Sequence, residues 1–317
     1  MLKVTFLGTS SGTPTKHRNV SGIAVRTTLG PDWFLVDVGE GTQHRLLTSS
    51  LSPHRMRLVF ITHAHGDHCL GLPGLLASMG MSGRQEPLAV WAPRSVTQWL
   101  DQTLATTVTH LPYDLDMRCT EDVTTWTWDE QVTLHARELR HRLPSHALEL
   151  DVTVTTRRLD LAALDALGIP RGPAWGRLQA GRPAVHDGVT VDPDQVSSVV
   201  TRRQRAIIGG DNADPAVLEP YVEDLDLLVH EATYTAEVAA QVGDWPMHSS
   251  AAQVALFAER HAIGNLILTH FSPRYDTLDD LAAEAREHYH GTLELARDGY
   301  TYALDAEGRL HRPPSSG

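Results

Sequence analysis

Cysteine is scarce in this chain, with two residues among 317. Two thiols are too few for a disulfide framework, and Cys69 and Cys119 lack the paired spacing of a zinc ribbon. Although Cys69 directly follows His68, we interpret it as a small buried packing residue, because free cysteine packs like a small hydrophobic side chain.

Long apolar runs are also absent. No segment approaches the roughly 18 apolar residues that predict a transmembrane helix, and Met1-Leu2-Lys3 leads into a predicted strand instead of a signal-peptide core. We therefore expect no membrane partner and a cytoplasmic location. The hydrophobic content of 41% is enough for one large domain or two lobes.

Basic residues are in the minority, with 27 against 39 acidic residues and a net charge of −12. This balance argues against a nucleic-acid binder that relies on its overall field. The segment from Arg157 to Arg205 has the opposite charge balance, since it contains eight arginines and five aspartates, a net charge of +3. That segment is either a local basic surface or a solvated arginine-rich loop.

Metal-ligand side chains are concentrated in one short motif, Thr62-His-Ala-His-Gly-Asp-His. It places His63, His65, Asp67 and His68 within six positions. Nitrogen and oxygen donors at this density suit a zinc-type ion, and a loop can fold the three histidines around one or two metals where a helix would scatter them. We predict a metal-binding loop with a catalytic ion. Surface or helix-capping histidines are the alternative.

Short apolar strands alternate with turns and helices along most of the chain. The predicted strands are Leu2–Leu7, Ile23–Thr27, Trp33–Val36, Leu58–Thr62, Leu88–Trp91, Val132–Leu139, Leu148–Thr155, Ala206–Gly210, Leu225–Val229, Leu266–Thr269, Leu293–Ala296 and Tyr300–Leu304. Helices are predicted to begin at Gly71 and to cover Leu159–Leu167, Ser250–His261 and Leu278–Tyr289. This α/β pattern fits a two-sheet sandwich with helices outside, an αββα arrangement, better than one doubly wound sheet.

One insertion rich in glycine and proline interrupts the pattern. We predict a first half at 1–155, an inserted flexible arm at 156–204, a second half at 205–311 and a disordered tail at 312–317.

Three further polar residues directly follow predicted apolar strands. They are His141, Asp211 and His270. A lone histidine at a strand end is usually a loop residue, but the sheets would bring all three tips to one edge. Asp211 is the most informative, since one carboxylate can bridge two ions about 4 Å apart.

The chain resembles the metallo-β-lactamase superfamily and, within it, the ribonuclease Z family of endonucleases, which trim the 3′ trailer from precursor tRNA. The superfamily signature is the run from His63 to His68. The narrower resemblance lies in Phe6-Leu-Gly-Thr-Ser-Ser-Gly-Thr-Pro-Thr, Val36-Asp-Val-Gly-Glu-Gly-Thr-Gln, Gly71-Leu-Pro-Gly-Leu-Leu, Gly210-Asp211-Asn212, His230-Glu-Ala-Thr, His248-Ser-Ser and Leu268-Thr-His-Phe-Ser-Pro-Arg-Tyr. These motifs span nearly the whole chain in order. The implied fold is an αββα metallo-β-lactamase sandwich with a protruding tRNA-binding arm.

The resemblance implies two Zn²⁺ ions per subunit, although Mn²⁺ also suits such ligands. One zinc would be held by His63, His65, His141 and Asp211, and the other by Asp67, His68, Asp211 and His270. A hydroxide bridging the ions would be the nucleophile, with Asp67 as its proton acceptor, and cleavage would leave a 3′-hydroxyl on the tRNA and a 5′-phosphate on the trailer.

The same resemblance assigns further roles. His248 and Glu231 would place a proton donor near the leaving oxygen, and Arg274 would clamp a phosphate; structural support is the alternative for all three. The arm would grip the tRNA elbow through its backbone phosphates, and the enzyme would be a homodimer. His230 is expected to be a packed core residue.

Three positions depart from the family pattern. His146 lies where it could compete with His141 as a ligand, although His141 is favoured because it follows its strand directly; Asn212 and Pro273 replace the usual residues without removing a ligand. Two other functions stay open. One is a phosphodiesterase or arylsulfatase-like esterase acting on small molecules, and the other is an RNA-binding scaffold with a degenerate metal site.

Overall fold

The computed structural model describes residues 2–313, so most of the tail that was expected to be disordered lies outside the described residues. The chain forms two compact units. Unit 1 comprises Met1–Val152 and Gln204–Gly317, and unit 2 comprises Thr153–Arg203. Among the described residues, every helix is too short or too polar to cross a bilayer.

The first sheet of unit 1 has the order β17-β16-β1-β2-β3-β4-β5-β6. Its strands are β1 (Leu2–Gly8), β2 (Gly22–Thr27), β3 (Trp33–Val36), β4 (Met56–Phe60), β5 (Leu88–Ala92), β6 (Leu115–Cys119), β16 (Thr301–Leu304) and β17 (Leu310–His311). Strands β3 to β6 are parallel. All residues of β3 and β5, and all but one of β4, are buried, which explains their continuous apolar sequences.

The second sheet has the order β15-β14-β13-β12-β9-β8-β7. Its strands are β7 (Thr125–Thr127), β8 (Val132–Leu139), β9 (Ser145–Leu159), β12 (Ser197–Ile208), β13 (Leu227–Glu231), β14 (Asn265–Thr269) and β15 (Thr292–Leu295). Strands β12 to β15 are parallel, so their carboxyl ends meet at one edge of the sheet. Strands β9 and β12 are longer than predicted because both continue into unit 2.

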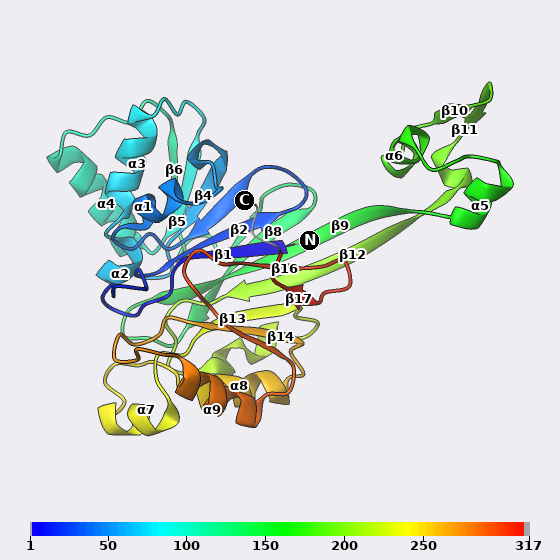
Figure 1. The fold of residues 1–317 in the computed structure, drawn as a ribbon. Coiled ribbons are helices and arrows are strands. Elements are labelled where there is room, and N and C mark those ends of the chain that lie inside the picture. The colour runs from blue at the N-terminus through cyan, green and yellow to red at the C-terminus, as the bar shows by residue number, and fades with distance from the viewer. Residues whose placement is uncertain (1, 314–317) are drawn as a thin grey trace. The chain divides into compact units, whose positions relative to one another are not determined.

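Helices cover the outer faces of both sheets (Figure 1). On the side of the first sheet lie α1 (Thr42–Leu47), α2 (Gly66–Cys69), α3 (Leu72–Met81), α4 (Arg94–Thr106) and the 3₁₀ turn η1 (Pro53–Arg55). On the side of the second lie α7 (Ala236–Val242), α8 (Ala251–Arg260), α9 (Asp279–His288) and η3 (Pro215–Tyr221). A capping box between Ser250 and Gln253 starts α8, and the buried face of this helix packs on β14. Helix α4 and strand β6 were not predicted.

Aromatic side chains join the inner faces of the two sheets. Phe60 of β4 contacts Trp91 of β5, with ring centroids 5.3 Å apart, and Trp91 lies 5.9 Å from Trp126 of β7. Trp128, which follows β7, contacts Phe34 of β3 at 5.1 Å. These edge-to-face contacts bury large apolar surfaces between the sheets. They confirm the predicted αββα sandwich.

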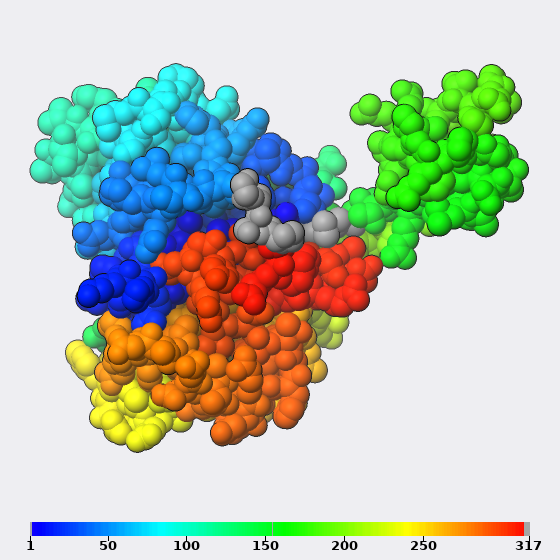
Figure 2. All heavy atoms as spheres, in the orientation of Figure 1, coloured from blue at the N-terminus to red at the C-terminus, as the bar shows by residue number. Residues whose placement is uncertain are grey.

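The N-terminal strand of the first sheet pairs with a strand from the C-terminal end of the chain. Strand β1 pairs antiparallel with β16, with Lys3 opposite Ala303. Figure 2 accordingly shows the blue N-terminal and red C-terminal segments side by side on unit 1. Past Gly8 the chain turns toward the second sheet, where Ser11 donates its backbone N–H to the carbonyl of Phe271.

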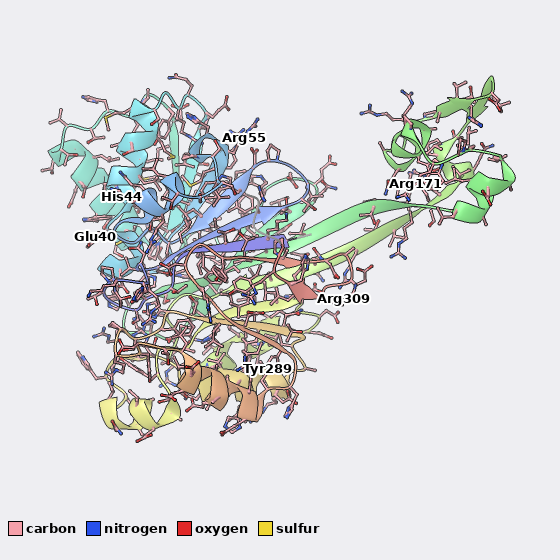
Figure 3. The ribbon with its side chains drawn as sticks, in the orientation of Figure 1. Glu40, His44, Arg55, Arg171, Tyr289 and Arg309 are labelled. Carbon is pink, nitrogen blue, oxygen red and sulfur yellow. The ribbon has the colours of Figure 1, made fainter. Side chains whose placement is uncertain are left out.

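Unit 2 has a small core of its own. Besides the ends of β9 and β12 it contains α5 (Leu161–Ala166), α6 (Pro173–Gln179), η2 (Pro193–Gln195) and the hairpin of β10 (Ala184–His186) and β11 (Val189–Val191). Its hydrophobic cluster consists of the buried residues Leu164, Ile169, Leu178, Ala184, Val191 and Val196. Arg171, labelled in Figure 3, belongs to its exposed surface. The unit overlaps the insertion predicted at 156–204.

Candidate metal centre

Strand ends from both sheets supply the polar residues of the site. The motif from His63 to His68 follows β4, Asp211 follows β12 and His270 follows β14. His141 follows β8 of the same second sheet. Ligand sites of open α/β sheets lie at the carboxyl ends of parallel strands, and the same rule operates here on two facing sheets.

The motif itself is only partly a loop. His63 and His65 lie in irregular chain, but one turn of helix, α2, begins at Gly66 and carries Asp67 and His68. The single turn points the two halves of the motif at different clusters. The expectation of a loop throughout was therefore wrong for its second half.

Four predicted ligands form a first cluster, made of His63, His65, His141 and Asp211, whose ligand atoms all lie within 4.8 Å of one another. His65 Nδ1 lies 2.9 Å from His63 Nε2 and 3.2 Å from His141 Nε2. Asp211 Oδ2 lies 3.5 Å from His63 Nε2 and 3.8 Å from His141 Nε2.

The other three predicted ligands form a second cluster, made of Asp67, His68 and His270. The Nε2 atoms of His68 and His270 are 3.2 Å apart. Asp67 Oδ2 lies 3.5 Å from the first and 3.4 Å from the second.

Asp211 faces both clusters with different oxygens. Its Oδ2 points to the first cluster, while its Oδ1 lies 3.4 Å from His68 Nε2 and 3.3 Å from His270 Nε2. Oδ1 is buried and has no hydrogen-bond partner among the described residues. A buried carboxylate oxygen without a partner is costly, so a cation in the second cluster, which Oδ1 faces, fits this donor set. The imidazole and carboxylate donors are those that zinc-type ions prefer.

Buried hydrogen bonds orient the imidazoles from behind. His68 Nδ1 lies 2.6 Å from Asp37 Oδ2, and His270 Nδ1 lies 3.1 Å from Thr233 Oγ1. His141 Nδ1 lies 2.9 Å from the carbonyl oxygen of Met247. Each contact turns the Nε2 atom of its ring toward the clusters, which is the usual arrangement behind a metal-binding histidine.

Left-handed backbone conformations occur at three residues of the site. Asp37 has a φ of 62°, Met247 of 55° and His270 of 57°. Non-glycine residues adopt such angles at a cost, and in folded proteins they gather at functional positions. Here they turn Asp37 and His270 into the site directly after their strands end.

Burial and neighbouring charges set the protonation of the histidines. Burial opposes the charged form of His68, but Asp211, Asp37 and Asp67 together raise its pKa well above the usual value. Burial lowers the pKa of His63 well below the usual value, and its histidine neighbours lower it further. Burial likewise lowers the pKa values of His65 and His141. The first cluster therefore offers neutral imidazoles, the form that binds metals.

The predicted proton-donor pair is present beside the clusters. His248 Nδ1 lies 2.8 Å from Glu231 Oε1, and Glu231 also accepts from the backbone N–H of Asn212 at 3.0 Å. Burial opposes the charged form of both residues, but the attraction between them outweighs it. Glu231 raises the pKa of His248 to about 9, and His248 lowers the pKa of Glu231 to about 2. His248 Nδ1 lies 3.8 Å from Asp211 Oδ2, so the pair borders the centre.

Other predicted residues lie in different surroundings. The exposed Arg274 is held by Ser272 Oγ at 3.1 Å and lies over the ring of Tyr234, 5.1 Å from its centroid. His146 is buried in β9 and belongs to none of the clusters found among the described residues. His230 is fully buried in β13 and Cys69 is 3% exposed, as expected for packing residues.

A cleft of about 370 Å³ opens onto the clusters. Ligand-cluster residues His65, Asp67, Asp211 and His270 line it together with His248. Glu40, just before α1 (Figure 3), and Arg142 add one charge of each sign.

Sequence reasoning missed the residues behind the ligands. Asp37 was quoted within a motif but given no role, and Thr233 was likewise only part of His230-Glu-Ala-Thr. The available signal was position, since Asp37 directly follows β3 just as Asp211 follows β12. Thr62, the first residue of the motif, donates its N–H and hydroxyl to Asp37, a role that only the folded chain shows.

Comparison with known proteins defines the class of this fold and site. A family model described as a beta-lactamase superfamily domain matches residues 32–271. The crystal structure of human tRNase Z, short form, superimposes with a TM-score of 0.66 over 96% of this chain and 99% of that one; at 24% identity it shows the fold alone. The chain is therefore a member of the metallo-β-lactamase superfamily.

Sequence relatives narrow the assignment. The chain is 45% identical over 312 residues to a protein named ribonuclease Z from Pseudomonas putida strain GB-1, covering 96% of this chain and 98% of that one. It is 42% identical over 319 residues to another of that name from Marinobacter nauticus, covering 98% and 99%. Within the superfamily, the chain belongs to the ribonuclease Z family.

Proposed function

We propose that this protein is an endoribonuclease that removes the 3′ trailer from precursor tRNA. The observation that carries the proposal is the position of Asp211, which offers one carboxylate oxygen to each of two ligand clusters. Two adjacent cation sites are the arrangement that hydrolyses phosphodiesters. Family membership supports RNA as the substrate, since the relatives are named ribonuclease Z.

We infer two Zn²⁺ per subunit, with Mn²⁺ as the other candidate. The first cluster would hold one ion and the second cluster the other, with Asp211 shared. When bound, the ions would activate water and neutralise charge on the attacked phosphate.

The chain's own residues supply the proton transfers. Asp67 accepts the backbone N–H of Gly12 at 2.7 Å, and its pKa lies well below the usual value because His68 and His270 outweigh the effect of burial. It is therefore ionised, the form that a proton acceptor needs, but so low a pKa makes it a weak base; bound cations that lower the pKa of the attacking water would make transfer of its proton to Asp67 favourable. His248, held by Glu231, would donate a proton to the ribose oxygen that leaves, which gives the tRNA its 3′-hydroxyl.

The substrate phosphates need cationic contacts outside the clusters. Arg274 is exposed next to Tyr234, where its planar guanidinium could hold a phosphate. Unit 2 carries exposed arginines, including Arg171, Arg177 and Arg182, and we propose that it binds the tRNA elbow. We further propose a homodimer that works in the cytoplasm, where precursor tRNA would be available.

The deciding experiment is cleavage of a precursor tRNA that carries a 3′ trailer. We expect a tRNA ending in a 3′-hydroxyl and a trailer beginning with a 5′-phosphate, and we expect no product after treatment with EDTA. If the protein hydrolyses bis(p-nitrophenyl) phosphate rapidly but leaves the tRNA intact, it is a small-molecule phosphodiesterase and the proposal is wrong.

The role of unit 2 is tested by shortening it. Asp160 donates its N–H to the carbonyl of Val196, so β9 and β12 still face each other there, and residues 161–195 can be replaced by an Asn-Gly turn. We expect cleavage of precursor tRNA to fall while hydrolysis of the small diester stays unchanged. A matched variant with glutamine at positions 171, 177 and 182 should weaken tRNA cleavage in the same direction. Equal losses on both substrates would exclude a role in tRNA binding.

A further inference from the structure

A tryptophan is exposed beside the candidate metal centre. Trp245 has 78% of its surface exposed, and the guanidinium carbon of Arg142 lies 5.3 Å from the centroid of its ring. Arg142 lines the cleft together with His65 and His248. Single exposed apolar residues are common, so exposure alone does not indicate a binding role. The position of Trp245 next to the cleft does.

The loop of Trp245 is joined to the centre through Met247 and is closed by a hydrogen bond of its own. The carbonyl oxygen of Met247 lies 2.9 Å from His141 Nδ1, and the N–H of Met247 donates to the carbonyl of Asp244. The rings of His141 and His248 have centroids 5.4 Å apart. Since three residues span at most about 11 Å, Trp245 lies close to the proposed proton donor His248.

Trp245 and Arg142 together offer two surfaces that suit one nucleotide. An indole face stacks on any nucleobase, and a guanidinium group binds phosphate. Within residues 2–313 Arg142 forms no direct ion pair, although Glu40 lines the same cleft, so its guanidinium group is available to a phosphate. An unpaired cation at the cleft, next to an exposed ring, favours a phosphate-bearing aromatic ligand.

We propose that Trp245 stacks on the base of the nucleotide that carries the leaving oxygen, while Arg142 contacts an adjacent phosphate. This proposal rests on the proposed function, because it requires RNA in the cleft. The side of the scissile bond is inferred from proximity: His248 would protonate the leaving 3′ oxygen, and the short loop keeps Trp245 within about 11 Å of His248 along the chain. Trp245 is thus a substrate-positioning residue that tolerates all four bases.

The test is a double-mutant cycle between protein and RNA. We expect Trp245→Ala to lower kcat/KM for precursor tRNA about tenfold or more, mainly through KM, and Trp245→Phe to keep most of it. An abasic nucleotide on the 5′ side of the scissile phosphate should cause a similar loss in the wild type but little further loss in Trp245→Ala. Losses that multiply would overturn the proposal, since they would show that the ring and the base do not interact.

Binding of the product gives a second readout. Mature tRNA with 2-aminopurine as its last nucleotide should lose fluorescence on the wild-type holoenzyme and keep it on Trp245→Ala. As a matched control, Leu47→Ala removes another side chain that is 78% exposed and should leave the quenching unchanged. Unaltered metal content and unfolding midpoint would show that Trp245→Ala is folded.

The outcomes separate this proposal from the function it rests on. A wild-type protein that cleaves no precursor tRNA refutes the proposed function itself. Normal cleavage with no effect of Trp245→Ala refutes only the stacking role. If Trp245→Ala instead converts a dimer to a monomer in sedimentation, the ring belongs to an interface between subunits and the stacking proposal is wrong.

Discussion

Replacing Asp37 by asparagine should weaken metal binding while leaving the fold intact. Asp37 Oδ1 accepts the N–H of Thr62 at 2.8 Å, and Oδ2 lies 2.6 Å from His68 Nδ1 and 3.0 Å from Thr62 Oγ1. In the variant, the amide oxygen can still accept the hydrogen bond from the N–H of Thr62. The NH₂ group of the amide then points toward His68. His68 Nδ1 must then accept a hydrogen bond, so the proton of the neutral ring moves to Nε2, where the metal would bind.

The opposite orientation of the amide does not restore the hydrogen bonds, because it places the NH₂ group, a donor, against the N–H of Thr62, another donor. Loss of such an orienting partner typically costs 10- to 100-fold in metal affinity, or about 1.4 to 2.8 kcal/mol. The fold should lose only about 1 to 3 kcal/mol, the cost of one mismatched buried hydrogen bond.

Competition with a chelator of known affinity measures the first effect, and urea unfolding in EDTA measures the second. Asp298→Asn is the matched control, since this buried carboxylate accepts from Thr9 Oγ1 and the N–H of Asn19 and contacts no histidine of the clusters. It should change stability without changing metal affinity. If Asp37→Asn binds metal within twofold of the wild type, Asp37 does not set the tautomer and the reasoning fails.

Three further predictions concern packing. Gly39→Ala places a Cβ 2.3 Å from a backbone oxygen and should lower the free energy of unfolding in urea by about 1 to 3 kcal/mol or more. Gly30→Ala, whose Cβ has no atom within 4 Å, should leave this free energy nearly unchanged. Equal losses in the two variants would contradict the steric argument. Arg84→Met leaves four carbonyl partners without their buried donor and should cost roughly 3 kcal/mol, against about 0.5 kcal/mol or less for the exposed Arg94→Met. Cys69 should resist iodoacetamide until the chain is unfolded, and its labelling in the native state, detected by peptide mass spectrometry, would show that the site opens.

Strand ends allowed the clustering of the candidate ligands to be predicted from sequence. Asp211 and His270 each follow an apolar run, and that local pattern requires no knowledge of which strands pair. The resemblance then assigned them to two ions. The structure brings them together because β12 and β14 are parallel strands of one sheet.

The strand-end pattern also marks Asp37, but its contact with His68 could not be predicted in the same way. Asp37 and His68 are 31 positions apart, and their contact depends on β3 lying next to β4. The left-handed backbone of Asp37 is likewise a product of tertiary structure, since aspartate favours it only weakly by itself. Strand β6 escaped prediction although its sequence Leu115-Asp-Met-Arg-Cys alternates apolar and polar residues, because five largely half-exposed residues without a β-branched or aromatic side chain give only a weak strand signal.

The wide separation of the ligands along the chain links the metal centre to completed synthesis. His68 and His270 are 202 positions apart, yet their imidazoles touch. A growing chain that has made the histidine motif holds only part of a site, and the second cluster can close only after β14 has joined its sheet. Metal that binds the finished fold but not the unfolded chain also stabilises it by mass action. Copies truncated before β14 should therefore lack His270 and hold at most the ion of the first cluster, so that occupancy of the second cluster would report that the chain has been made and folded through His270.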